Sequence, residues 1–449
     1  VKEDIKRRGI VMKITVNEKH TMIVEGEATI KIVDGEVEIF GSRFSKGEVI
    51  YVPYAKALPL YVLKKLSAEA LFSEGGKIRE VDENTIPNDW DSVFEEINLL
   101  IKNSKNIPVV LFIGDVDTGK TTLITYVMNK LSQSGYNIAV IDADTGQSDV
   151  GPPTTIGLGL LRKGKVVYSL KDVEFIDAFF LGLTSPAGLL HRSITGVQLM
   201  VEKAKKLDTN AILIDTTGWV YDHNARDLKL LKVLSVKPDL IVLIEKENEL
   251  EYYYKMFHKF FKILRVTASR YVRARDREER RMLRQKMYAY FLLNAKEIEI
   301  DLEQTSALYS FLWTGSEVNN EDAINLISST LSIEVNKILY VEETTDCIIV
   351  ITERGTFIPI DKVDKLKDVF AKREVKVISR DVFDNLLVAF LDSNFSFLGI
   401  GTILDVDFKK RKLKVYSNVN PNNVSALMFG YIRISPEGEE LGWTGHWPF

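Results

Sequence analysis

The sequence predicts an α/β protein with a central parallel β-sheet flanked by helices, a small N-terminal β domain and a C-terminal β-rich domain. Near-continuous apolar runs that end in an acidic residue or a glycine alternate with helical stretches, at residues 109–113, 138–142, 211–215 and 240–245. Such runs are typical of parallel strands covered on both faces. Ligands of these sheets bind at the carboxyl ends of the strands, so we expect the functional residues there.

We expect three domains, which a chain of 449 residues is long enough to form. Residues 1–86 hold short alternating segments separated by turn signals such as Asp34-Gly35, which predicts an antiparallel β domain. A central domain is expected over 87–330. Residues 331–449 return to short strands and turns and form the predicted C-terminal domain.

Composition excludes several classes of protein. The net charge of −4 argues against a basic nucleic-acid coat, so any nucleic-acid site must be a local basic patch. The single cysteine, Cys347, excludes an internal disulfide and a metal cluster built on cysteines. No apolar run reaches the roughly 18 residues that a membrane span needs. We therefore expect a cytoplasmic protein that makes no contact with a membrane.

The most specific motif matches the phosphate-binding pattern G-x-x-x-x-G-K-[ST] and reads Gly114-Asp115-Val116-Asp117-Thr118-Gly119-Lys120-Thr121-Thr122. A predicted strand precedes it and a predicted helix follows it, which is the context that its chemistry requires. Backbone amides and the helix N-terminus favour a bound phosphate. We expect Lys120 to reach the β- and γ-phosphates and Thr121 to hold Mg²⁺. The alternative is a glycine-rich turn that matches by chance.

Acidic residues follow the second and third predicted strands of the central sheet. The second strand ends in Asp142-Ala143-Asp144-Thr145-Gly146-Gln147. Two acids spaced i, i+2 point the same way, so one can orient Mg²⁺ and one can accept the proton of an attacking hydroxyl. Asp215 takes the position of a second acid facing the metal. The alternative is that these acids only cap strand-end turns.

Two loops and one tryptophan are predicted to border the same site. The runs at 151–157 and 180–186 are loop-forming and would supply walls of a cleft. Trp219 follows Gly218 directly after the third strand. A tryptophan at this position either belongs to the core or stacks on a nucleic-acid base, and spacing alone leaves both open.

An arginine-rich segment follows. Residues 262–286 carry ten Lys or Arg against three Asp or Glu. We interpret a segment over about 262–290 as a mobile lid, because arginine forks match phosphate oxygens and can neutralise a phosphoryl group during transfer. The alternative is a solvated helix face with i,i+4 ion pairs.

In this order, the motifs resemble the polynucleotide 5′-hydroxyl kinase family. That family includes the kinase subunit of the mRNA 3′-end cleavage factor, the pre-ribosomal-RNA processing kinases and single-protein archaeal members. The resemblance covers most of the chain and is most specific in the central domain. The family's D-x-G-Q element matches residues 144–147, its P-P-T-T run matches 152–155, and its T-S-P run matches 184–186. Asp117 stands where the family has an acid before x-G-K.

The resemblance also implies roles for the tryptophan and for the arginines. The family's clasp, T-x-G-W, matches Thr216, Gly218 and Trp219, and its tryptophan stacks on a substrate base near the 5′ end. Two lid arginines spaced five apart match Arg275 and Arg280, with Arg273 and Arg277 as another pairing. The N-terminal domain resembles one that closes over the adenine.

The resemblance implies an ATP- and Mg²⁺-dependent kinase that phosphorylates the 5′-hydroxyl of RNA, with DNA as an open second acceptor. The alternative is an ATP-binding RNA-processing scaffold that has no catalytic activity. The expected catalytic residues are Lys120, Asp144, Arg275 and Arg280. ATP is expected to contact Gly114, Asp117, Thr118, Gly119, Lys120, Thr121, Thr122 and Gln147. The nucleic acid is expected to contact Thr184, Ser185, Thr216, Gly218 and Trp219. Mg²⁺ is expected at Thr121 and Asp144. Protein partners are not predicted.

Overall fold

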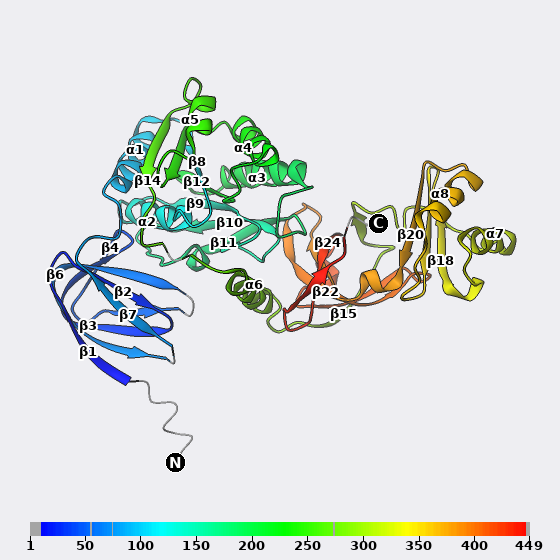
Figure 1. Ribbon diagram of the computed structural model, residues 1–449, viewed down its shortest axis with the longest axis horizontal. Coiled ribbons are helices and arrows are strands. Elements are labelled where there is room, and N and C mark those ends of the chain that lie inside the picture. The colour runs from blue at the N-terminus through cyan, green and yellow to red at the C-terminus, as the bar shows by residue number, and fades with distance from the viewer. Residues whose placement is uncertain (1–9, 54–55, 74, 273, 446–449) are drawn as a thin grey trace, which may run out of the picture.

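A computed structural model describes residues 10–53, 56–73, 75–272 and 274–445. The predicted fold class is confirmed: an α/β core lies between an N-terminal β-sheet and C-terminal β-sheets (Figure 1). None of the helices in the described ranges is long and apolar enough to cross a membrane.

The N-terminal sheet has the order β4-β3-β6-β2-β7, with β1 added along β6 and β5 along β3. Its strands are β1 (Ile10–Val16), β2 (Thr21–Glu25), β3 (Ala28–Ile39), β4 (Ser42–Ser45), β5 (Val49–Val52), β6 (Ala57–Phe72) and β7 (Lys77–Val81). Asp34-Gly35 is not a turn between strands. β3 runs through it with shifts of register, and Gly35 has φ +98°. A Cβ at Gly35 would lie 2.3 Å from Lys65 O, so this dipeptide forms a bulge.

The core sheet has the order β11-β10-β9-β12-β8-β13-β14. The neighbouring strands β9, β12, β8, β13 and β14 run parallel to one another. At one edge of the sheet, β10 is antiparallel to both of its neighbours, β9 and β11. The strands are β8 (Val109–Gly114), β9 (Ile138–Ala143), β10 (Thr155–Leu161), β11 (Glu174–Phe180), β12 (Ala211–Thr216), β13 (Leu240–Glu245) and β14 (Ile263–Thr267). The four predicted apolar runs correspond to β8, β9, β12 and β13. The interior strand β10 was missed, because the run 151–157, which was predicted to be a loop, enters this strand at Thr155.

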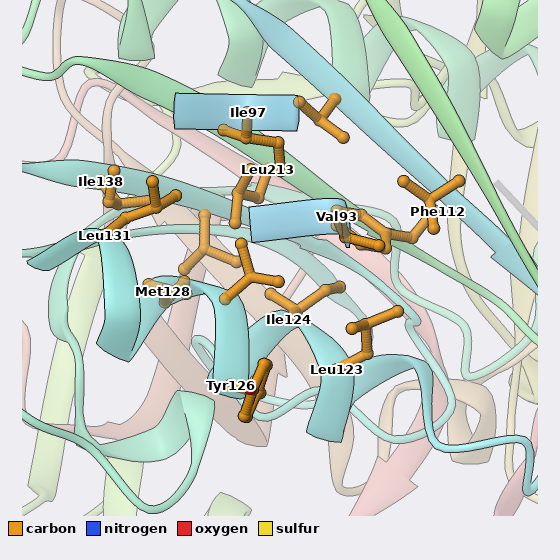
Figure 2. Close-up of a cluster of buried hydrophobic side chains, with 14 of the residues drawn as sticks. Val93, Ile97, Phe112, Leu123, Ile124, Tyr126, Met128, Leu131, Ile138 and Leu213 are labelled. Atoms are coloured by element: carbon orange, nitrogen blue, oxygen red, sulfur yellow. The ribbon is translucent and has the colours of Figure 1, made fainter. Parts of the chain in front are cut away.

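Helices cover both faces of the core sheet. One face packs against α1 (Trp90–Asn103) and α2 (Lys120–Gln133), through the apolar cluster drawn in Figure 2. The other face packs against α3 (Leu190–Ala204), α4 (His223–Val236) and α5 (Glu251–Phe257). Because both faces are buried, the carboxyl edge of the sheet is where polar side chains can gather.

β14 lies inside the segment predicted as a lid over about 262–290, so the lid begins later than expected. β14 is an edge strand, and its central Arg265 pairs with Glu245 at 2.6 Å and with Glu251 at 2.7 Å. A charged residue in a half-exposed strand breaks the apolar run that marks a central strand, which explains the error. The lid arginines belong instead to the loop before α6 (Arg277–Phe291) and to α6 itself.

The C-terminal part forms two sheets. The larger has the order β15-β23-β22-β21-β24-β16, with β25 beside β24. Its strands are β15 (Lys296–Asp301), β16 (Ser306–Leu308), β21 (Leu386–Leu391), β22 (Phe397–Asp407), β23 (Lys412–Ser417), β24 (Ala426–Ile434) and β25 (Glu440–Trp443). Since β15 pairs with β23, this sheet starts before the boundary expected at 330. β15 alternates charged and apolar residues, so it lacks the continuous apolar run by which the central strands were predicted.

The smaller C-terminal sheet is inserted between β16 and β21 and has the order β17-β18-β19-β20. It projects to the far end of the molecule in Figure 1, away from the core. Its elements are β17 (Ser316–Glu317), α7 (Glu321–Leu331), β18 (Ile338–Glu343), β19 (Cys347–Thr352), α8 (Ile360–Val369) and β20 (Glu374–Ser379).

Candidate active site

The phosphate-binding motif forms a tight loop between β8 and the N-terminus of α2. Gly119 is the N-cap of α2 with φ +89°, and a Cβ there would lie 3.0 Å from Val272 Cγ2. At Gly114 a Cβ would lie 2.4 Å from Ile244 Cγ2. Glycine is therefore required at both positions, and the loop curls with its amides at the start of a helix, where an anion is stabilised.

Lys120 lies inside this loop. Its Nζ donates to the carbonyl oxygens of Gly114 at 2.9 Å and Asp115 at 2.8 Å. Burial lowers the pKa of Lys120, while the carboxylates of Asp215 and Asp144 act against that shift. The ammonium is thus held at the base of the loop, where the phosphates of a nucleotide would lie.

Thr121 and Asp215 connect the start of α2 to the end of β12. Thr121 Oγ1 donates to Asp215 Oδ2 at 2.6 Å. Burial raises the pKa of Asp215 to about 6, although Lys120 and the Thr121 hydrogen bond lower it. Asp215 and Asp142 are register partners on β12 and β9. Burial and repulsion from Asp215 and Asp144 raise the pKa of Asp142 well above its usual value.

Asp142 shapes the loop that carries Asp144. Its carboxylate accepts hydrogen bonds from the backbone amides of Asp144 (3.0 Å), Asp149 (2.6 Å) and Val150 (3.1 Å). Asp144 in turn accepts from Gly146 N at 3.2 Å. The first acid of the pair, whose role the sequence left open, is therefore a support for the loop, and the second is half-buried at the cavity.

The segment after β12 lies directly against the phosphate-binding loop. A Cβ at Gly218 would lie 2.7 Å from Val116 N and 2.8 Å from Val116 Cα, so only glycine permits this approach. Trp219 follows it, half-buried, and its indole Nε1 donates to Asp222, the N-cap residue of α4. Asp222 also accepts from Ala225 N at 3.0 Å. The start of α4 thus fixes the orientation of the Trp219 indole.

Two lysines that sequence reasoning missed lie fully buried on α4. Lys229 Nζ donates to Thr217 O at 2.6 Å and to Thr216 Oγ1 at 2.9 Å. Lys232 Nζ has no acceptor within hydrogen-bond distance among the described residues. The sequence held one signal: both lysines stand at helical spacing among Ala225, Leu228, Val233 and Val236, which form the buried face of α4.

The predicted lid arginines contact the phosphate-site loops. Arg280 Nη2 donates to Asp117 Oδ2 at 3.1 Å, and Arg275 Nη1 donates to Gln147 Oε1 at 3.2 Å. Of the alternative pairing, Arg273 lies outside the described residues. Arg284, which sequence reasoning did not select, also lines the cavity and donates to Gly146 O at 3.4 Å.

One cavity of about 670 Å³ brings most of the predicted site residues together. Those that line it are Asp117, Gly119, Lys120, Thr121, Thr122, Asp144, Gln147, Thr184, Ser185, Gly218, Trp219, Arg275 and Arg280.

Four other predicted residues, Gly114, Thr118, Asp215 and Thr216, are not part of its wall. Thr118 Oγ1 donates to Asp115 O at 2.9 Å and Thr216 Oγ1 to Phe112 O at 2.7 Å, and both threonines are fully buried. Thr216 is therefore a support of the clasp rather than a substrate contact, and Thr217 takes its place on the wall.

The N-terminal sheet supplies a wall that the sequence did not predict residue by residue. Its contribution is mostly apolar and consists of Ile23, Phe40, Lys56, Ala57, Leu58 and Pro59. Trp90 at the start of α1 and Tyr168 add aromatic surface. Lys56 Nζ donates to Ser169 Oγ at 2.9 Å and lies 3.5 Å from Asp149 Oδ2, which ties the N-terminal sheet to the core. The cavity is thus polar at one end and apolar at the other.

The side chains at the polar end fit Mg²⁺. They offer the Thr121 hydroxyl and the Asp144 carboxylate, and oxygen ligands are those Mg²⁺ prefers. Asp215 lies behind this wall and accepts the hydrogen bond of the Thr121 hydroxyl. In the described ranges there is no group of three His, Cys, Asp or Glu side chains that could hold a metal. Mg²⁺ usually takes its remaining ligands from substrate phosphates and water, so this sparse donor set suits it.

Comparison with known proteins identifies the family and the fold. Residues 114–293 match the family described as the mRNA cleavage and polyadenylation factor CLP1 P-loop. The solved structure of the wild-type Clp1p–Pcf11p complex aligns over 95% of this chain and 99% of its own, with a TM-score of 0.63 and 13% identity. That likeness establishes a shared fold.

Curated relatives are more similar in sequence. The polyribonucleotide 5′-hydroxyl-kinase of Pyrococcus furiosus is 32% identical over 358 residues, covering 80% of this chain and 95% of the relative. The enzyme of the same name from Methanocaldococcus jannaschii is 28% identical over 352 residues, covering 78% and 93%. The chain therefore belongs to the family of the polyribonucleotide 5′-hydroxyl-kinases.

Proposed function

We propose that this chain is an ATP- and Mg²⁺-dependent kinase that transfers the γ-phosphoryl group to the 5′-hydroxyl of an RNA end. The observation that supports it most is the shared cavity: Lys120, Asp144, Trp219 and Arg280 border the same space of about 670 Å³. The phosphate-binding loop and the Trp219 indole, on which a base could stack, thus border the same cavity.

ATP is proposed to lie across the two ends of the cavity. Its phosphates fit the loop amides and Lys120, and its base fits the apolar wall of the N-terminal sheet. Mg²⁺ would be held by Thr121 and, through water, by Asp144. When bound, it would neutralise phosphate charge and orient the phosphates for in-line displacement.

The remaining side chains suit the acceptor. The 5′-terminal base would stack on Trp219, and Thr184 and Ser185 border the path of the strand. Asp144 would accept the proton of the 5′-hydroxyl while the hydroxyl oxygen forms the new bond to the γ-phosphorus. The bond from the γ-phosphorus to the β–γ bridging oxygen breaks, and ADP leaves. Arg275 and Arg280 would stabilise the charge on the transferred group.

The test is transfer of label from γ-labelled ATP to matched RNA and DNA oligonucleotides with free 5′-hydroxyl ends, with Mg²⁺ and with a chelator. We expect Mg²⁺-dependent labelling of RNA, and Lys120→Ala should abolish it while the circular dichroism spectrum is unchanged. DNA labelling measures whether the acceptor site requires a 2′-hydroxyl. A chain that binds ATP and RNA but transfers no phosphate would be the catalytically silent scaffold, and the proposal would fail.

A further inference from the structure

The helix that carries the lid arginines is built into the C-terminal domain. Tyr288 and Leu292, on one face at its end, lie in an apolar cluster with Leu387, Ile432 and Ile434 of the C-terminal sheet. Tyr288 is fully buried. In Figure 1, α6 lies between the core and this sheet. The end of α6 is therefore packed against the C-terminal sheet, through Tyr288 within the helix and Leu292 directly after it.

The turn before β25 contacts the backbone of the same helix. Gly438 has φ +89°, and a Cβ there would lie 2.6 Å from Ala289 N and 2.9 Å from Gln285 O. Such close approach fixes the position of α6 along the sheet as well as its rotation. Glu440 follows this turn as the first residue of β25 and is register partner of Ile434.

Glu440 contacts the side of α6 that carries Arg280, Arg281 and Arg284, which we call the arginine face. Its carboxylate forms a bidentate pair with Arg284, at 2.5 Å from Nε and 2.9 Å from Nη2. Arg281 Nη2 donates to the Glu440 carbonyl at 2.6 Å. The Arg284 and Glu440 side chains are only 17% and 14% exposed. Paired forks of this kind fix geometry better than single contacts between flexible side chains.

Arg284 carries the connection into the cavity. Its remaining nitrogen, Nη1, donates to Gly146 O in the loop of Asp144, and its side chain lines the cavity. Arg280 lies one helical turn earlier, so the two guanidinium groups are on the same side of α6. Whatever holds Arg284 therefore also sets where Arg280 meets the phosphate-binding loop.

We propose that Glu440 is a positioning residue for phosphoryl transfer: through Arg284 it holds the arginine face of α6 at the mouth of the cavity. This rests on the proposed kinase function, and it gives the C-terminal domain a part in the reaction that is transmitted through Arg284. The groups proposed to bind the ATP phosphates lie on α2 and its loop. Loss of Glu440 should therefore weaken the stabilisation of the transition state by the α6 arginines more than it weakens ATP binding.

The test compares Glu440→Lys with Glu439→Lys. Glu439 is the adjacent residue, is exposed, and takes the same change of charge. For Glu440→Lys we expect kcat on RNA to fall roughly 10- to 100-fold with KM for ATP within about twofold, as misplacement of positioning groups does. Glu440→Gln, which keeps one acceptor oxygen, should show a smaller loss. Equal kcat for the Glu440→Lys and Glu439→Lys variants would overturn the proposal.

A second readout does not depend on turnover. Amide hydrogen exchange over residues 277–291 should accelerate in Glu440→Lys and stay at the wild-type rate in Glu439→Lys. A wild-type chain that phosphorylates no oligonucleotide would refute the kinase function; the exchange experiment would still decide whether Glu440 anchors α6. Equal exchange in the two variants would show that it does not.

Discussion

Replacing Lys232 by methionine should stabilise the protein. The Lys232 side chain is fully buried on α4, and its ammonium has no hydrogen-bond acceptor among the described residues. Burial lowers its pKa to about 8 from an ordinary 10.5, although Asp144 and Asp142 act in the opposite direction. Methionine keeps an apolar stem of similar length and removes the charge.

The size of the stability gain and its pH dependence follow from the difference between the folded and unfolded pKa values of Lys232. At about 1.36 kcal/mol per pKa unit, the buried charge costs roughly 3 kcal/mol of unfolding free energy at pH 7. The unfolded chain binds this proton more tightly. The wild-type protein therefore recovers stability as the pH rises from about 8 to 10.5. The advantage of Lys232→Met should be complete at pH 7 and shrink across that window.

Urea unfolding followed by circular dichroism, at pH 7 and at pH 9.5, measures the stability gain of Lys232→Met and its decrease with pH. Lys206→Met is the matched control, because Lys206 is exposed and the same substitution there should change stability by less than about 0.5 kcal/mol. The reasoning is refuted if Lys232→Met is less stable than the wild type at pH 7, or if its gain is the same at both pH values.

Three further predictions concern the clasp. Gly218→Ala places a Cβ 2.7 Å from Val116 N, so it should cost about 1–3 kcal/mol of stability. Calorimetric titrations should also show weaker binding of both ATP and RNA, and an unchanged affinity for ATP would contradict the close approach. Lys229→Met should raise KM for RNA about tenfold or more with KM for ATP unchanged, since it frees the segment that leads to Trp219; equal effects on both KM values would count against this. Trp219→Ala should weaken oligonucleotide binding by about 1–3 kcal/mol in fluorescence anisotropy, and an equal loss for ATP would exclude base stacking.

Much of the polar end of the cavity could be predicted from the sequence, because its residues follow strands whose burial is visible as apolar runs. Once β8, β9 and β12 are placed side by side, Lys120, Asp144 and Trp219 must meet at one edge of the sheet. Short-range constraints, such as the glycine at the start of α2, are also visible locally.

The features that were missed depend on contacts between distant segments. The apolar wall comes from another sheet, and no local pattern in β6 shows that Leu58 faces the cavity. The partnership of Arg284 and Glu440 spans residues far apart in the chain. Lys229 and Lys232 were missed because lysine is seldom fully buried, so composition gives no reason to place them inside the protein. Glu299 of β15 pairs with Lys412, and such charged edge strands resemble helices in sequence.

The central claim is that the phosphate cradle and the clasp for a strand end meet in one cavity. Binding of a bisubstrate compound, in which adenosine is joined through a polyphosphate to the 5′ end of an oligoribonucleotide, tests it most directly. The claim predicts affinity at least about tenfold above that of ATP or the oligonucleotide alone, with losses in both Lys120→Ala and Trp219→Ala. Affinity no higher than that of ATP, and unaffected by Trp219→Ala, would contradict it.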